Sequence, residues 1–280
     1  MQFPLQEYSR STRFQIFLGA AIVLLLFIFA GFADFISPFP PNRIVSEMLQ
    51  PPSSSHVMGT DTLGRDVFSR LLHGARYSLY VSSISVVIGV SVGTLAGVLS
   101  GYLGGPVDQI MTVLSDTLWA FPLYVMAIMF VIAFGITITS IAVAVAITYI
   151  PQYFRVVRSI TLSIKEREFV NSVRLLGASR MHIVVHHILP YTVSSVAVLA
   201  SLAVADSVLT VSGLGFLGLG IQPPTPEWGT DLRFARDYIP SGIWWPAVFP
   251  GIMIFLTVLG FNLLSEGLNS ITVEKYGELK

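Results

Sequence analysis

Long stretches without a charged side chain alternate with short polar segments along this chain. Each of six uncharged stretches is long enough to cross the hydrocarbon core of a membrane, which takes about 20 apolar residues of helix. They cover residues 14–33, 77–107, 117–154, 181–205, 207–226 and 238–265. The pattern predicts an integral membrane protein.

The predicted membrane helices number six. The interval 109–150 is too long for one crossing, and Gly135 marks a break between the third and fourth helices. We therefore expect an all-α membrane protein with both termini on the same side of the bilayer. The helices are expected at residues 17–36, 80–101, two within 109–150, 191–211 and 245–268.

Basic residues concentrate on one side of the predicted membrane, and this bias sets the orientation. An N-in, C-in topology places ten Lys and Arg residues in the cytoplasm and six outside. It also places residues 152–190, between helices four and five, in the cytoplasm. The ten are Arg10, Arg13, Arg155, Arg158, Lys165, Arg167, Arg174, Arg180, Lys275 and Lys280, and the six are Arg43, Arg65, Arg70, Arg76, Arg233 and Arg236.

The chain divides into two parts. Residues 1–76 comprise the N-terminal tail, the first helix and an outer loop, and residues 77–280 form a five-helix core with a cytoplasmic loop at 152–190. Within the outer loop, residues 59–76 predict a separate amphipathic helix at the outer interface, with Asp61 or Thr62 as N-cap. Its apolar face is expected to hold Val67, Leu71 and Leu72.

Glycine marks two further features. A glycine at every fourth residue of the second helix lets backbones approach closely in lipid, so we expect tight helix packing there and no ligand role. Residues 213–226, between helices five and six, are rich in Gly and Pro and predict a short loop that dips into the outer opening of the helix bundle. The glycines of the stripe are Gly89, Gly93, Gly97 and Gly101.

Composition removes several classes of function. Sixteen basic and sixteen acidic residues balance, which gives no support for nucleic-acid binding, and the absence of cysteine removes disulfides and thiolate chemistry. Residues 213–218 match the dinucleotide fingerprint in letters, but they close a membrane helix instead of following a strand. This sequence has no phosphate-binding loop of the Walker type, so any nucleotide hydrolysis belongs to another chain.

Metal binding and catalysis are also not expected. His182 and His186 have a zinc-binding spacing, and His187 follows them, but Ile183 stands where a metalloprotease requires Glu. We interpret these histidines as part of a basic, water-facing helix end. The sequence also lacks paired catalytic carboxylates, so we expect a non-catalytic chain.

The cytoplasmic residues 165–190 are the most informative part of the sequence. They predict a short amphipathic helix interrupted at Gly177, with Pro190 opening the next membrane helix. Such an element fits a lipid surface or a groove on a partner protein, and the spacing does not choose between them. Its apolar face is expected to carry Phe169, Val173, Leu176 and Ile183.

Residues 171–179 read Asn-Ser-Val-Arg-Leu-Leu-Gly-Ala-Ser, and residues 187–190 read His-Ile-Leu-Pro. This stretch resembles the cytoplasmic coupling loop of ABC-type importer permeases, whose pattern is Glu-Ala-Ala, three residues, Gly, nine residues, Ile-x-Leu-Pro. Gly177, Leu189 and Pro190 occupy the matching positions. The chain departs at 171–173, where the family has Glu-Ala-Ala, and at His187, where it has Ile.

Three more segments narrow the resemblance to the C-type subunit of the dipeptide and oligopeptide branch, which also includes nickel carriers. Residues 59–79 resemble its outer-loop signature, residues 101–116 its first inner loop and residues 216–229 its last outer loop. The chain departs at Val211, where an acidic residue is expected, and in the tail from Ser265.

The resemblance implies a permease subunit in the plasma membrane of a prokaryote. Its implied partners are a homologous second permease subunit, two ATPase subunits that hold ATP and Mg²⁺, and an extracytoplasmic substrate-binding protein; this chain itself would bind no cofactor. Di- or oligopeptides are the expected cargo, with oligosaccharides or nickel as alternatives. The implied ATPase-coupling residues are Asn171, Ser172, Val173, Arg174, Gly177, Ala178, Ser179, Leu189 and Pro190.

Two acidic residues lie within predicted membrane helices, where a charge is costly and normally faces the bundle interior or a water-filled path. Asp116 would lie about 10 Å from the cytoplasmic end of its helix, and Asp206 about 24 Å along its own. Each is either part of a translocation path or a packed polar group bonded to a neighbouring helix. Both would also suit an ion-driven carrier, whose uptake an ionophore abolishes and vanadate does not.

Overall fold

The computed structural model describes the backbone of residues 10–277 and the side chains of residues 10–193 and 195–271. This part of the chain is helical and has no β-strand, which confirms the predicted all-α class. Five of its helices are long and apolar enough to cross a membrane. They are α1 (Arg10–Gly31), α3 (Val67–Leu103), α6 (Ile138–Lys165), α9 (Leu189–Phe216) and α11 (Trp245–Gly277).

The sixth span is a broken one. Helices α4 (Gly105–Trp119) and α5 (Leu123–Phe134) meet at a bend of 98° and make one span only if they are counted together. The expected break at Gly135 is confirmed, because this residue ends α5 with a φ of +85°. The second break, before Pro122, was not predicted; proline has no N–H to donate and disfavours a helical residue before it.

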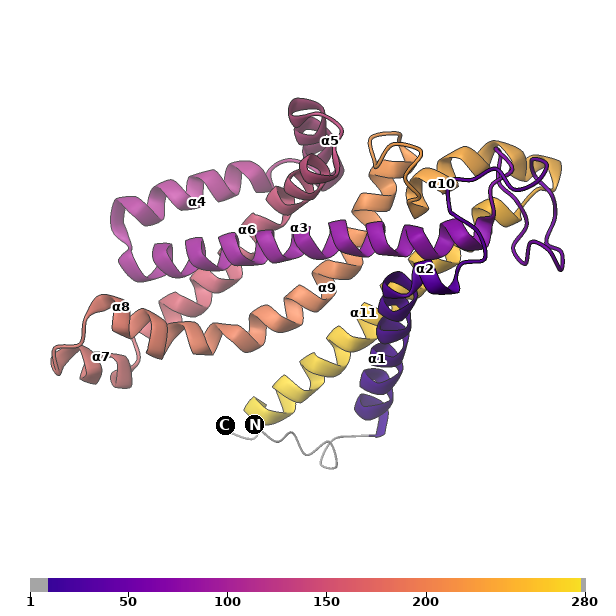
Figure 1. Ribbon diagram of the computed structural model, residues 1–280. Coiled ribbons are helices and arrows are strands. Elements are labelled where there is room, and N and C mark those ends of the chain that lie inside the picture. The colour runs from indigo at the N-terminus through magenta and orange to yellow at the C-terminus, as the bar shows by residue number, and fades with distance from the viewer. Residues whose placement is uncertain (1–9, 278–280) are drawn as a thin grey trace.

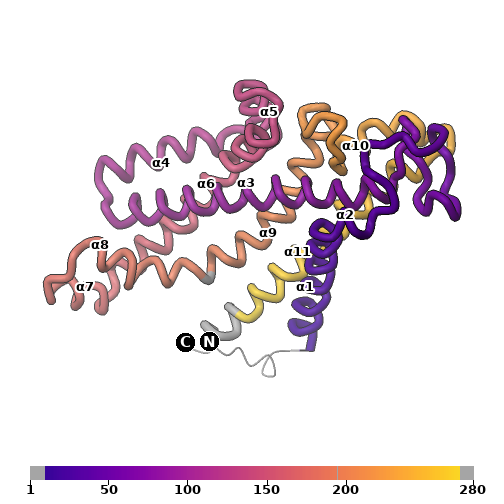
Figure 2. Tube along the Cα trace, viewed as in Figure 1, coloured from indigo at the N-terminus to yellow at the C-terminus, as the bar shows by residue number. Residues whose placement is uncertain are grey.

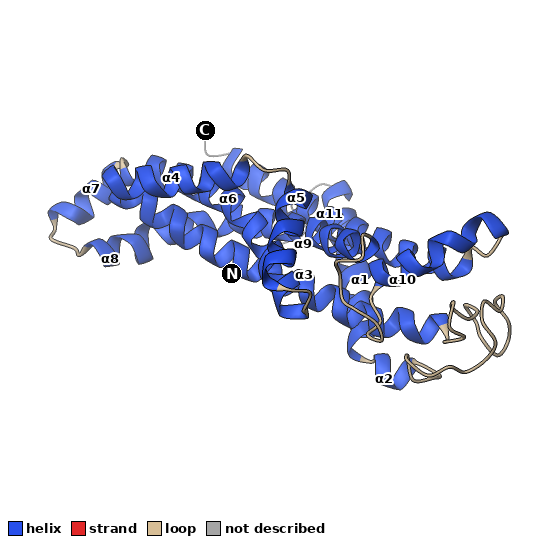
Figure 3. Cartoon of the chain, turned by 90° about the horizontal axis from the view of Figure 1, so that it is seen from above, coloured by secondary structure: helices blue, strands red, loops and turns tan. Residues whose placement is uncertain are grey.

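The remaining helical elements are short and lie toward the two ends of the molecule. In Figures 1 and 3, α7 and α8 lie at one end of the long helix α3, and α10 lies toward the other. This arrangement separates the predicted cytoplasmic loop from the outer loops. The short elements are α2 (Ala33–Ile36), α7 (Glu168–Leu175), α8 (Arg180–Ile183), a π-helix (Val184–Ile188), α10 (Trp228–Ala235) and a 3-10 helix (Arg236–Ser241).

Glycines determine how closely the long helices pack. A Cβ atom at Gly93 would lie 2.6 Å from the Tyr153 Cβ, and one at Gly97 would lie 2.7 Å from the Phe154 carbonyl oxygen. The predicted glycine stripe therefore seats α6 directly on the backbone of α3. Figure 2 shows α1 running beside α11, where a Cβ at Gly19 would lie 2.8 Å from the Gly260 carbonyl oxygen.

The expected separate helix over residues 59–76 is wrong. Residues 59–66 form a compact loop, and α3 begins at Val67 and continues without interruption into the membrane. Its N-cap is Asp66, whose carboxylate accepts a hydrogen bond of 2.8 Å from the Ser69 N–H. Asp61 instead holds the loop, accepting from the backbone N–H of Arg65 at 2.9 Å. The predicted apolar face is confirmed, since Val67, Leu71 and Leu72 are all buried.

The last outer loop also begins later than expected. Helix α9 continues through Gly213 and ends at Phe216, because its glycines pack against neighbours instead of interrupting the helix. Helix α10 (Trp228–Ala235) follows the predicted loop, at residues for which the sequence had predicted no helix. A Cβ at Gly213 would lie 2.8 Å from the Tyr124 ring.

Candidate functional site

The predicted coupling loop is a helical hairpin that one glycine makes possible. Helix α7 carries residues 171–174 and is followed by Gly177, whose φ of +85° is a left-handed conformation suited to glycine. Ser179 then caps α8 by accepting a hydrogen bond of 3.2 Å from the His182 N–H. Leu189 and Pro190 begin α9, as the sequence predicted.

A buried face anchors this hairpin to the membrane helices. Val170, Ile183 and Ile188 are at most 1% exposed and pack with Val157 and Ile164 of α6. Phe169 and Val173 pack at the edge of the same cluster. The hairpin is therefore held rigidly against α6 and the start of α9.

The tip of the hairpin points away from this cluster. Leu175 is 89% exposed and Leu176 is 87% exposed, so the expectation that Leu176 shares one apolar face with Phe169, Val173 and Ile183 is wrong. The physical reason is that Leu176 lies after the last turn of α7, where the chain begins to reverse at Gly177. Two adjacent leucines in contact with water form an apolar tip.

The three histidines lie beside the hairpin. The His182 and His186 rings stack with centroids 4.4 Å apart, both side chains are exposed, and the His186 Nδ1 contacts the His182 carbonyl oxygen at 3.2 Å. Within the part of the chain that the structure describes, no group of three potential ligands could hold a metal ion.

The two predicted path residues differ in their surroundings. Asp116 on α4 forms an ion pair of 2.7 Å with Arg155 of α6, so it is bonded to a neighbouring helix. The Arg155 guanidinium also lies 4.8 Å from the centre of the Trp119 ring. Asp206 lies on α9, and the structure gives its carboxylate no ion pair or hydrogen bond. No bond joins the two aspartates.

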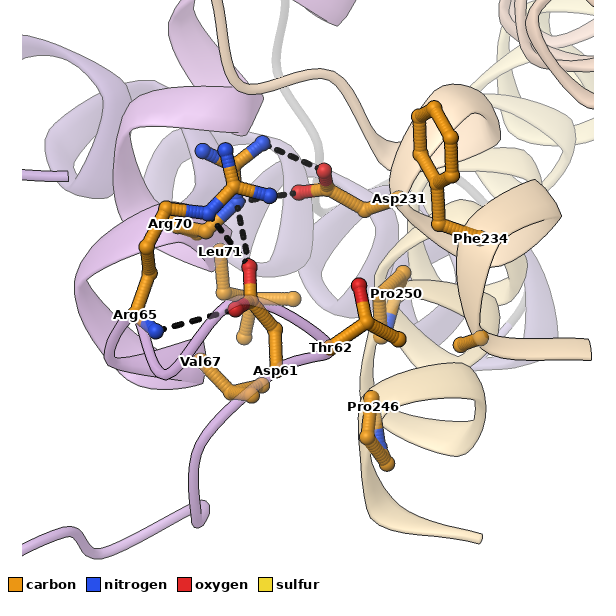
Figure 4. A pocket seen from close by; sticks show the side chains of 11 residues that line it. Asp61, Thr62, Arg65, Val67, Arg70, Leu71, Asp231, Phe234, Pro246 and Pro250 are labelled. Carbon is orange, nitrogen blue, oxygen red and sulfur yellow. Dashed lines mark hydrogen bonds and ion pairs between the residues drawn. The ribbon is translucent and has the colours of Figure 1, made fainter. Parts of the chain in front are cut away.

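An ion-pair network that the sequence did not reveal joins the predicted outer loops. The Arg70 guanidinium of α3 lies 2.5 Å from an Asp231 oxygen of α10 and 3.5 Å from an Asp61 oxygen (Figure 4). The Arg65 guanidinium lies 2.6 Å from the same Asp61 oxygen. Arg70 also donates to the carbonyl oxygens of Pro41 and Pro224 at 3.2 and 3.3 Å. Arg70 thus connects both predicted outer signature segments.

Glu227 and Trp228 strengthen the same junction, and the sequence reasoning missed both. The fully buried Glu227 carboxylate caps α10 by accepting from the Gly229 and Thr230 N–H groups, each at 2.8 Å. Burial raises the pKa of this carboxyl above its usual value. The Trp228 indole donates to the Leu71 carbonyl oxygen at 3.0 Å. The acidic residue before Trp-Gly-Thr was a detectable N-cap signal.

Comparisons with known proteins agree with this architecture. The model of a family described as the binding-protein-dependent transport system inner membrane component matches residues 93–275. The chain is 46% identical over 270 residues to the glutathione transport system permease protein GsiD of Shigella flexneri serotype 5b (strain 8401), covering 95% of this chain and 88% of the relative.

Proteins of the same name from Escherichia coli O6:K15:H31 (strain 536 / UPEC) and Shigella boydii serotype 4 (strain Sb227) are each 43% identical over the same shares of both chains. The matched region contains Gly93, Gly97 and Gly101 of the glycine stripe, the predicted coupling hairpin and α10. The chain therefore belongs to the family of binding-protein-dependent transport system inner membrane components, and it is a permease subunit of an ABC importer in the inner membrane.

Proposed function

We propose that this permease carries di- or oligopeptides, glutathione among them, into the cell, driven by ATP hydrolysis on partner subunits. Its relatives are glutathione transport permeases, and glutathione is a tripeptide, which supports peptide cargo over oligosaccharides or nickel. Membership in an ABC importer family argues against the ion-driven alternative. The excess of Lys and Arg in residues 152–190 supports an N-in, C-in orientation.

The apolar tip of the coupling hairpin carries the proposal. Leu175 and Leu176 are almost fully exposed, although they follow a helix whose other face is buried. Burying each leucine in a groove on an ATPase subunit would contribute about 1.5–3 kcal/mol, which is enough for a stable contact. Residues 171–174, on the same helix, then lie beside that groove, and Gly177 to Ser179 set the angle of the tip.

Rigid packing connects the hairpin to the cargo path. Movement of α7 would be passed through Val170 and Ile183 to α6 and α9, because close-packed clusters move as units. ATPase closure would thereby favour one of two bundle arrangements, one open inward and one open outward. A second permease subunit would complete the path, and an external binding protein would deliver cargo to the outer loops.

The test uses the complete transporter, with its second permease, two ATPase subunits and binding protein, in proteoliposomes. The double change Leu175→Ser and Leu176→Ser should weaken ATPase attachment at least a hundredfold, because about 3 kcal/mol or more of apolar burial is lost. Both side chains are exposed, so the chain's own fold should persist. Glu166→Gln, at the exposed end of α6, is the control.

Gly177→Leu tests the coupling step separately. A leucine at a φ of +85° is strained, so the tip should be misplaced while the buried anchor remains. We expect ATP hydrolysis without uptake of radiolabelled glutathione. Wild-type uptake by both the double variant and Gly177→Leu would refute the proposed role of the hairpin. Uptake of maltose or nickel in place of peptides would refute the cargo.

A further inference from the structure

Asp206 differs from the other acidic residues in the membrane helices. The side chains of Asp108, Asp116 and Glu266 are bonded to Arg158, Arg155 and Gln15, respectively. Among the described side chains of these helices, the Asp206 carboxylate alone lacks a hydrogen-bond donor or a cation. Its side chain is exposed in the isolated chain, on a helix that packs against α3, α6 and α11.

Its depth makes this lack of a partner costly. The apolar part of α9 is the 22-residue segment Ser195–Phe216, and Asp206 is in the middle of it. At 1.5 Å per residue, the carboxylate lies about 16 Å from the start of a hydrocarbon core roughly 30 Å thick. A carboxylate at that depth needs water or a positively charged ligand.

Two tyrosines on α6 share this environment. Tyr149 is 2% exposed and Tyr153 is fully buried, and the Tyr153 hydroxyl has no hydrogen-bond partner. Both belong to a packed cluster that also contains Ala203 and Val211, which precede and follow Asp206 on α9. Buried polar atoms without partners are rare in proteins and require an explanation. Arg155, the cation that follows Tyr153 on α6, is already paired with Asp116.

We propose that Asp206 forms a subsite for the primary ammonium group of the cargo. The carboxylate balances the positive charge and accepts hydrogen bonds from the N–H groups of the ammonium. A single carboxylate binds such a group weakly enough for it to leave, as conduction requires. This inference rests on the proposed peptide cargo and names the group by which the path recognises it.

The absence of cysteine from the chain permits a direct test. Leu209 lies one helical turn after Asp206 and is 41% exposed, so Leu209→Cys is a reporter on the same face. In the assembled transporter, we would measure the rates at which this chain reacts with a cationic and an anionic methanethiosulfonate reagent. The ratio of cationic to anionic rates should fall about tenfold on adding Asp206→Asn and persist with Asp206→Glu. An unchanged ratio, or no labelling at all, would overturn the proposal.

Uptake provides the second measurement. Asp206→Asn should lower the uptake of glutathione about tenfold, while ATP hydrolysis stimulated by the loaded binding protein stays at the wild-type level. Asp206→Glu should restore most of the uptake. Wild-type uptake by Asp206→Asn would overturn the subsite and leave the proposed function intact. Failure of the loaded binding protein to stimulate hydrolysis in the unmodified transporter would count against the proposed function itself.

Discussion

Replacing Arg70 with alanine tests the outer junction most directly. This side chain is 3% exposed, and its guanidinium connects α3 to Asp231 of α10, to Asp61 and to two loop carbonyl oxygens. No other described cation lies within ion-pair distance of Asp231. Truncation would therefore leave the Asp231 carboxylate, which is 13% exposed, without a countercharge.

The destabilisation caused by Arg70→Ala depends on which ion-pair partners Asp61 and Asp231 retain. Removing one partner of a buried ion pair costs about 3–5 kcal/mol, because the remaining charge stays desolvated. Asp61 keeps Arg65 at 2.6 Å, so only Asp231 is fully uncompensated and we expect the lower end, about 3 kcal/mol. Asp231→Asn in the Arg70→Ala background should recover a large part of this loss, because it removes the stranded charge.

Hydrogen exchange measures this effect locally. In the assembled transporter, amides of α10 and of residues 59–66 should exchange roughly a hundredfold faster in Arg70→Ala, since about 1.4 kcal/mol corresponds to a factor of ten. Arg236→Ala is the control, because the Arg236–Asp237 pair is exposed and such pairs contribute about 1 kcal/mol or less. An acceleration below threefold in Arg70→Ala, or one equal to that of the control, would refute the reasoning.

Two further predictions concern packing and pH. Gly93→Ala should lower the thermal midpoint of the purified transporter, because the new Cβ would lie 2.6 Å from the Tyr153 Cβ and overpacking costs about 1–3 kcal/mol. Gly251→Ala is the control and should cause no loss, since this helical glycine has open space around it. Equal losses in the two variants would contradict the close packing of α6 on α3. Because burial raises the folded-state pKa of Glu227 above its reference value of 4.5, the protection of α10 against exchange should decrease as pH rises from 4.5 through the raised pKa. Glu227→Gln should remove this pH dependence, and a slope retained by that variant would exclude Glu227 as its source.

The helical spans were predictable because their signal is local. Runs of uncharged residues, the glycine spacing at Gly93 and the breaks at Gly135 and Gly177 each depend on a few neighbouring residues. The chemistry of lipid allows few alternatives, since a backbone in the hydrocarbon core must satisfy its own hydrogen bonds. The order of motifs also indicated the importer family before the fold was known.

The errors arose where distant segments meet. The bend before Pro122 and the start of α3 at Val67 depend on which polar side chain reaches which backbone group. Leu176 could not be placed by periodicity, because its exposure follows from the chain reversal after α7. Glu227 offered an N-cap signal, but its burial against Ser78 required the fold.

The sequence by itself determined that this chain is a helical membrane protein and which segments are apolar enough to cross the bilayer, since hydrophobicity and glycine spacing act within single helices. Only the tertiary structure decided which charges are paired. Asp116 and Asp206 look alike in the sequence, yet an arginine from another helix neutralises the first and none reaches the second. The physical reason is that electrostatic partners are set by distances across the bundle, which helix packing alone establishes.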